Sequence, residues 1–169
     1  MTAPLAPATS TDGRGALRTW LRLLACTSLV ERAVRRRLRE RFATTLPRFD
    51  VLAQLDAAER DGDGPAAGLT MSELSQRLMV TNGNLTGLVE RLAEERLVRR
   101  APSPRDGRVQ LVRLTVAGKR ALDAMAPEHQ AWIDAMFAGL GDDDRARLYD
   151  LLGALRGSIR ASLDLEASR

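Results

Sequence analysis

The sequence has few aromatic residues, one cysteine and one histidine, and these scarcities exclude several kinds of protein. Aromatic side chains make up 4% of the 169 residues, whereas hydrophobic residues together make up 44%. A core built mainly from Leu, Val and Ala favours helices. A single cysteine cannot form an internal disulfide, which agrees with a reducing cytoplasm. One histidine and one cysteine cannot close a metal site by themselves, so we expect no metal and no cofactor.

Long apolar runs and catalytic motifs are missing as well. No stretch approaches the roughly 18 consecutive apolar residues of a membrane span, so we expect none. The first ten residues have neither a basic start nor a long apolar run, and we expect residues 1–12 to be a disordered tail rather than a signal peptide. The chain has no nucleophile elbow, no phosphate loop and no metal-ligand spacing. We therefore predict that it is not an enzyme.

The charge is unevenly distributed along the chain. Residues 81–120 contain nine Lys or Arg and four Asp or Glu, whereas residues 121–169 contain five and nine. A basic middle followed by an acidic C-terminal part suggests that a polyanion contacts the middle, and nucleic-acid phosphates suit clustered guanidinium groups. From charge alone, an ordinary solvated surface with uneven charge explains the pattern equally well.

Helical patterns cover most of the chain. Thr70 and Glu73 have the spacing of a capping box, and Thr81 and Thr115 are placed to cap the helices that follow them. We expect Pro127 to interrupt or offset its helix. The predicted helices span residues 15–42, 47–60, 71–78, a segment after Thr81, 116–139 and a segment that begins near Asp142.

Two of these helices are short and joined by a tight turn, which is typical of a helix-turn-helix. The second carries Leu85, Leu88, Val89 and Leu92 on one apolar face. Two strand-like runs, 97–100 and 109–114, follow directly as a β-hairpin. This order predicts a mainly α fold with a small β-wing, in which residues 47–115 form a winged helix-turn-helix lobe.

The polar face of the second helix has the residue types that suit the DNA major groove. Asn can bind adenine through two hydrogen bonds, Thr can touch phosphate or a thymine methyl, and Gly permits close backbone approach. Arginines on the hairpin turn can reach the neighbouring minor groove or its phosphates. Asp106 is expected to accept hydrogen bonds from Arg108 or a nearby amide and so to hold the turn in shape. The predicted DNA-binding residues are Thr81, Asn82, Gly83, Asn84, Thr86, Arg91, Arg105, Asp106 and Arg108.

Four segments carry a recognisable pattern: LPRFDVLAQL at 46–55, LTMSELSQRLMVTNGNLTGLVERL at 69–92, PSPRDGRVQLVRLT at 102–115 and AGKRAL at 117–122. Together they resemble the multiple-antibiotic-resistance regulator (MarR) family of winged-helix repressors. Within them, Asp106-Gly107-Arg108 resembles the family's wing-tip signature, and Leu114, Thr115 and Gly118 resemble its entry into the fifth helix. Arg96 is a departure, because the family pattern has glycine there. That implies either a left-handed residue at Arg96 or a different helix cap.

The resemblance implies a DNA-binding transcriptional regulator, usually a repressor, that binds double-stranded DNA as a homodimer. Residues 13–46 and 116–169 would form its helical dimerisation region. The apolar stripe from Leu148 to Leu163 fits this role, although an intramolecular core would produce the same pattern. Two-fold symmetry then predicts a palindromic operator with half-sites about one helical turn apart.

The resemblance also implies release from DNA by a small aromatic effector bound between the dimerisation helices and the winged lobe. An aromatic wall with one cation suits an aromatic carboxylate, and the candidates on the matching elements are Trp20, Arg48, His129 and Trp132. The two tryptophans are more often core or interface residues, and such a histidine is more often at the surface.

Two other functions remain open from the residues themselves. Cys26 would be the sensor in a redox-sensing regulator, but its apolar setting within a helix favours a buried structural thiol. A winged-helix fold can also serve as a protein–protein interaction module without DNA binding. The exposed Asn, Thr and Gly face and the wing arginines argue against the second of these.

Overall fold

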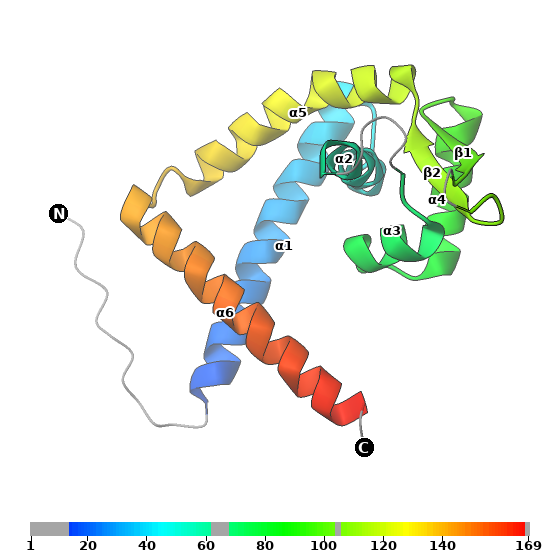
Figure 1. The fold of residues 1–169 in the computed structure, drawn as a ribbon. Coiled ribbons are helices and arrows are strands. Elements are labelled where there is room, and N and C mark those ends of the chain that lie inside the picture. The colour runs from blue at the N-terminus through cyan, green and yellow to red at the C-terminus, as the bar shows by residue number, and fades with distance from the viewer. Residues whose placement is uncertain (1–13, 62–67, 104–105, 168–169) are drawn as a thin grey trace. The chain divides into compact units, whose positions relative to one another are not determined.

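The computed structural model describes residues 14–61, 68–103 and 106–167. The chain forms two compact units, one ending at Glu128 and one beginning at His129. The predicted fold class is confirmed, because helices dominate and a single two-stranded sheet forms the wing within the described residues (Figure 1). The elements are α1 (Gly15–Phe42), α2 (Leu46–Asp61), α3 (Met71–Leu78), α4 (Asn82–Glu94), β1 (Val98–Pro102), β2 (Gln110–Leu114), α5 (Val116–Phe137) and α6 (Asp142–Ala167).

The core of the first unit lies under the winged lobe. Buried apolar side chains come from α2, α3, α4, both strands, the second half of α1 and the first part of α5. Leu74 of α3 and Leu85, Val89 and Leu92 of α4 are fully buried, which is what the 3.6-residue periodicity predicted. The helix-turn-helix is thus held against α2 by its apolar faces, and its polar faces point outward.

The wing is an antiparallel hairpin with a third short segment beside it. Val98 pairs with Leu114 at its base, and Pro102 pairs with Gln110 near its tip. Leu69, just before α3, exchanges two backbone hydrogen bonds with Val112, with N···O distances of 3.1 and 2.8 Å. These bonds attach the hairpin to the start of the helix-turn-helix, so the wing and α3 share one framework.

Most predicted element bounds are within two residues of the observed ones, and one prediction is wrong. Helices α1 and α3 match their predicted bounds, and α2 is one residue longer at each end. The helix α5 does not break at Pro127 but continues through it to Phe137. A proline inside a helix removes one backbone donor and crowds the preceding turn, and here the remaining bonds carry the helix past that point.

The helix cap at Thr70 was predicted correctly. At Thr81 the position of the cap was predicted correctly, but the capping hydrogen bond was not. Thr70 Oγ1 accepts the Glu73 N–H at 3.1 Å, and Glu73 Oε2 accepts the Thr70 N–H at 2.8 Å, which is the complete capping box. Thr81 stands at the N-cap of α4 in extended backbone, but its side chain makes no capping hydrogen bond, which corrects that prediction. The residue is exposed, so water can satisfy the first N–H groups of α4.

The N-terminal half of α1 and the whole of α6 leave large apolar side chains exposed. Within the described residues, burial along α1 begins only at Val34, and no side chain of α6 is buried. Cys26 is exposed, so the expectation of a buried thiol is wrong: it lies on the part of α1 that precedes the core. None of the described helices has the length and apolar character needed to cross a membrane. The exposed apolar residues are Leu17, Trp20, Leu21, Leu24 and Leu29 on α1, and Leu151, Leu152, Leu155, Ile159 and Leu163 on α6.

Candidate nucleic-acid interface

The second helix of the helix-turn-helix presents the predicted polar face to solvent. Gly83, Asn84, Thr86 and Arg91 are exposed along α4, opposite the fully buried Leu85. Asn82 begins the helix, but its side chain is outside the described part of the structure. No heavy atom lies within 4 Å of a Cβ placed on Gly83. A flat partner can therefore approach the α4 backbone closely at its N-terminal end.

The wing tip has the shape that Asp106 was predicted to maintain. Asp106 Oδ1 accepts the backbone N–H of Arg108 at 3.0 Å, and the Asp106 carbonyl accepts the N–H of Val109, also at 3.0 Å. This confirms the local structural prediction for Asp106. Arg108 is exposed on the resulting turn, as are Arg99 and Arg100 on β1. Arg105 lies outside the described residues.

The end of α4 is closed by a left-handed residue, which is the first of the two alternatives that the departure at Arg96 left open. Arg96 has a φ of 59°. Its N–H donates to the Ala93 carbonyl at 2.9 Å, and the Leu97 N–H donates to the Leu92 carbonyl at 2.8 Å. These two bonds form a Schellman motif, in which glycine is the usual left-handed residue. Arg96 adopts this conformation despite its Cβ, at a steric cost that glycine would avoid.

Thr115 and Gly118 clamp this helix end to the start of α5. The Thr115 hydroxyl donates to the Arg96 carbonyl at 2.6 Å and accepts the Gly118 N–H at 3.0 Å, so it caps α5 as predicted. A Cβ placed on Gly118 would lie 1.9 Å from the Leu97 carbonyl oxygen. The sequence predicted Thr115 as a helix cap, whereas Gly118 was identified only through the family resemblance. The structure gives the physical reason: the turn after α4 passes directly over the α5 backbone.

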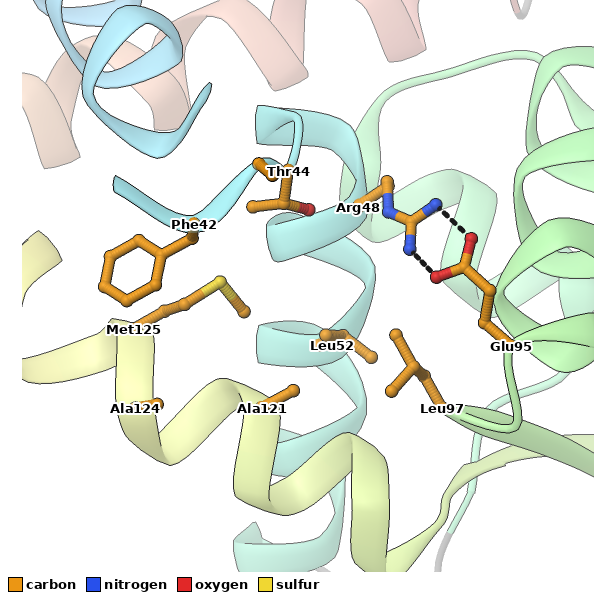
Figure 2. Close-up of a pocket in the computed structure, with 10 residues that line it drawn as sticks. Phe42, Thr44, Arg48, Leu52, Glu95, Leu97, Ala121, Ala124 and Met125 are labelled. Atoms are coloured by element: carbon orange, nitrogen blue, oxygen red, sulfur yellow. Dashed lines mark hydrogen bonds and ion pairs between the residues drawn. The ribbon is translucent and has the colours of Figure 1, made fainter. Parts of the chain in front are cut away.

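A pocket of about 310 Å³ lies beside this junction, between α1, α2, α5 and the end of α4 (Figure 2). One of its walls is polar, because Arg48 of α2 and Glu95 meet there through two hydrogen bonds. The bond from Arg48 Nη1 to Glu95 Oε1 is 2.7 Å, and Nη2 bonds Oε2. The hydrogen bond with Glu95 raises the pKa of Arg48, and the bond with Arg48 lowers the pKa of Glu95.

The four predicted ligand-binding residues are not all gathered in this pocket. Arg48 lines it, whereas Trp20 is exposed on α1 and does not. His129 and Trp132 belong to the second unit, where their rings meet edge to face with centroids 6.5 Å apart. Burial lowers the pKa of His129. Among the described residues, no group of three or more His, Cys, Asp or Glu is placed to hold a metal ion.

Sequence reasoning did not find Glu95, although it provides half of the pocket's polar wall. Glu95 and Arg48 are 47 positions apart, and no short-range pattern links them. The available signal was indirect. Glu95 stands at the end of the second helix of the helix-turn-helix, and Arg48 stands in the first turn of α2. These two side chains meet only if both helices converge on α5.

Comparisons with known proteins agree with this winged helix-turn-helix architecture. A sequence model of the MarR family matches residues 44–109. An uncharacterised HTH-type transcriptional regulator from Bacillus cereus is 29% identical over 134 residues, which is 79% of this chain and 83% of the relative. A MarR variant from E. coli, crystallised with operator DNA, is 26% identical with a TM-score of 0.69, over 86% of this chain and 99% of that one.

A third protein with this fold is BpsR from Bordetella bronchiseptica, whose DNA binding is regulated by 6-hydroxynicotinic acid. It is 21% identical with a TM-score of 0.67, over 82% of this chain and 98% of BpsR. The fold and the exposed second helix define a winged helix-turn-helix protein. Residues 44–109 are similar to the MarR family of transcriptional regulators, and the chain has the same fold as MarR regulators of known structure.

Proposed function

We propose that this chain represses transcription by binding a palindromic operator as a homodimer, and that a small aromatic ligand releases it. The observation that carries the proposal is the pairing, within one lobe, of an exposed polar α4 face with an arginine-bearing wing turn. The operator-bound MarR variant from E. coli supports the same mode of binding.

In this proposal α4 enters the major groove. Asn84 and Thr86 read base edges from the exposed face, and Asn82 joins them from the first turn. No described side chain caps the first turn of α4, so its N–H groups and the Thr81 hydroxyl are available to a phosphate. Gly83 permits the close approach that such a contact needs, and Arg91 binds the backbone further along the helix.

The wing binds the flanking DNA. Asp106 holds the turn so that Arg108, together with Arg105, reaches the minor groove or its phosphates. Asp106 itself carries a negative charge and therefore acts on the turn rather than on phosphate. This division of roles predicts that Arg108 contributes affinity and Asp106 contributes shape.

Two copies associate through the terminal helices. We assign residues 13–46 and 116–169 to dimerisation and residues 47–115 to DNA binding; residues 1–12 precede the described part. The exposed apolar stripes of α1 and α6 support this assignment, because a second copy would bury them. The regulation of BpsR by 6-hydroxynicotinic acid supports an aromatic effector, for which Arg48 is the candidate that lines a pocket.

The function is tested by selection from a pool of random duplexes at near-physiological salt. We expect a palindrome with half-sites about one helical turn apart. Arg108→Ala should weaken binding to that palindrome about tenfold and reduce the salt slope by about one, whereas the exposed Arg18→Ala on α1 should change neither. Recovery of no enriched sequence would overturn the proposal and favour a protein-interaction module.

A further inference from the structure

Helix α1 carries an excess of positive charge that the proposed function does not use. Residues 14–42 contain nine arginines and two glutamates. Arg35 pairs with Glu31 at 2.7 Å, and Arg41 pairs with Glu128 at 3.0 Å. Six other arginines are exposed and make no ion pair with any described residue. They are Arg14, Arg18, Arg22, Arg32, Arg36 and Arg39.

These six arginines lie on one face of α1, which is a single unbroken helix (Figure 1). At 3.6 residues per turn, they fall within an arc of about 100° and extend over about 38 Å. Within α1, Glu40 is the one acid in this arc. Val34 and Leu38, which join α1 to the buried core, lie about half a turn round the helix from Arg36. The six residues, here called the α1 arginine stripe, therefore face away from that core.

The stability of the helix does not account for the α1 arginine stripe. Arg39 is in the last turn, where the helix dipole favours a cation. Arg14 and Arg18 are at the opposite end, where the dipole disfavours a cation, and the first turn contains no acid. Arginines four positions apart, such as Arg32 and Arg36, also repel each other. The stripe therefore destabilises α1, and a bound polyanion would remove that cost.

A second copy of the chain does not offer a matching acidic surface on α6. The clustered acids of this helix are Asp142, Asp143 and Asp144, which occupy one turn, or about 5 Å. Further along, the exposed Arg147 and Arg160 interrupt the negative charge. Within the described part of α6, no acidic face is therefore as long as the stripe. A DNA duplex carries phosphates along its whole length and complements the stripe better.

Resting on the function proposed above, we propose that the α1 arginine stripe is a second DNA-binding surface, which holds a duplex segment other than the operator. A duplex as long as the stripe carries about 20 phosphates. Contacts to phosphates carry no base information, so this surface binds DNA of any sequence. A chain bound to its operator through α4 and the wing thereby holds another stretch of DNA on α1.

The second surface is tested with the full chain in a capture assay. An immobilised operator palindrome is saturated with protein, and a labelled duplex of about 30 base pairs without the palindrome is then titrated at several salt concentrations. We expect capture that weakens steeply as salt rises. The double variant Arg32→Gln with Arg36→Gln should weaken capture about tenfold and reduce its salt slope by about two, with operator affinity unchanged.

Two matched double variants serve as controls. Arg147→Gln with Arg160→Gln removes the same charge from exposed positions on α6 and should leave capture unchanged. Arg32→Lys with Arg36→Lys keeps the charge on α1 and should retain most of the capture, because the contact is to phosphate charge. No capture by the operator-saturated wild type, or equal losses in the α1 and α6 glutamine variants, would overturn the proposal.

Two further outcomes separate this proposal from its alternatives. Vesicles containing phosphatidylserine should bind the wild type more weakly than the duplex does. Tighter vesicle binding that is lost in Arg32→Gln with Arg36→Gln would assign the stripe to a lipid surface and overturn the DNA assignment. If the wild type selects no palindrome, the proposed function fails. Titration of random duplex into the wild type and the same double variant then decides the stripe by itself.

Discussion

The winged lobe buries most of its large apolar side chains, whereas the first half of α1 and all of α6 leave theirs exposed. In the described part of the chain every buried side chain falls between Val34 and Met125. The first half of α1 and all of α6 carry apolar stripes of similar length, yet Trp20 is 55% exposed and Ile159 is 49% exposed. The lobe thus buries its own hydrophobic surface, whereas large apolar side chains on the first half of α1 and on all of α6 stay exposed.

Under the proposed function, this contrast separates two tasks within one chain. A surface that binds DNA must hold its shape, which agrees with the closed core and the capped and clamped ends that support α4 and the wing. A dimer interface needs an apolar stripe that a second copy can cover, which agrees with the exposed stripes of α1 and α6. Substitutions can therefore damage one task and spare the other.

The largest effect is expected from Gly118→Ala, which should destabilise the folded lobe. The added methyl would stand 1.9 Å from the Leu97 carbonyl, so the turn after α4 must shift. We expect a loss of about 3 kcal/mol in the free energy of unfolding, measured by urea titration. Gly157→Ala on α6 is the matched control, because nothing lies within 4 Å of its Cβ. An exposed helical glycine replaced by alanine should gain about 1 kcal/mol. Equal responses at the two glycines would contradict the contrast.

The second-largest effect is expected from two substitutions on α6 that should prevent dimer formation and leave the lobe folded. Leu152→Glu with Leu155→Glu places two charges in the α6 stripe, where a second copy would have to bury them. We expect a monomer by sedimentation and an operator affinity reduced about a hundredfold, because the two half-sites no longer bind together. Ala161→Glu puts the same charge on the opposite face of α6 and should leave the dimer intact. A dimer that survives the double substitution would place the interface elsewhere.

The third-largest effect is expected at Asp50, where α2 contacts α1. Burial raises the pKa of Asp50 from 3.8 to about 6; Glu31 adds to the rise and Arg35 opposes it. Between these two values the folded state binds more protons than the unfolded state, so stability falls as pH rises through the window. Asp50→Asn should therefore stabilise the protein by about 1 to 2 kcal/mol near pH 7 and by almost nothing near pH 3. A benefit that is the same at both pH values would contradict this assignment.

The smallest effect is expected from Arg96→Gly, at the end of α4 in the lobe. Arg96→Gly removes the Cβ from the left-handed position and should stabilise the lobe by about 1 kcal/mol, measured by thermal unfolding. Ala43 is also left-handed, at the end of α1, with a φ of 48°. Ala43→Gly is therefore a second site for the same experiment. No gain at either residue would show that their surroundings offset the strain.

Local patterns predicted most of the lobe. The apolar spacing of Leu85, Val89 and Leu92 was enough to place α4 and its outward face, and Thr70 with Glu73 was enough to place the start of α3. These features depend on residues close in sequence, where helix geometry determines which side chains meet. The wing followed from two strand-like runs around a turn.

Features that depend on distant residues could not be predicted in this way. The Arg48–Glu95 pair and the contact between Gly118 and the Leu97 carbonyl both require the tertiary fold. Cys26 was misjudged for a related reason: an apolar neighbourhood along a helix does not show whether anything covers that helix. The path of α5 through Pro127 likewise depends on packing, which outweighs the local preference.

In the proposed function, a self-contained lobe binds DNA while the terminal helices bring two copies together. Sedimentation of the chain, alone and mixed with its selected duplex, tests both parts at once. We expect two chains per particle without DNA and two chains on one palindromic duplex, with the Leu152→Glu and Leu155→Glu double variant sedimenting as a monomer. A wild-type monomer that binds one half-site with full affinity, or a dimer that binds no duplex, would contradict it.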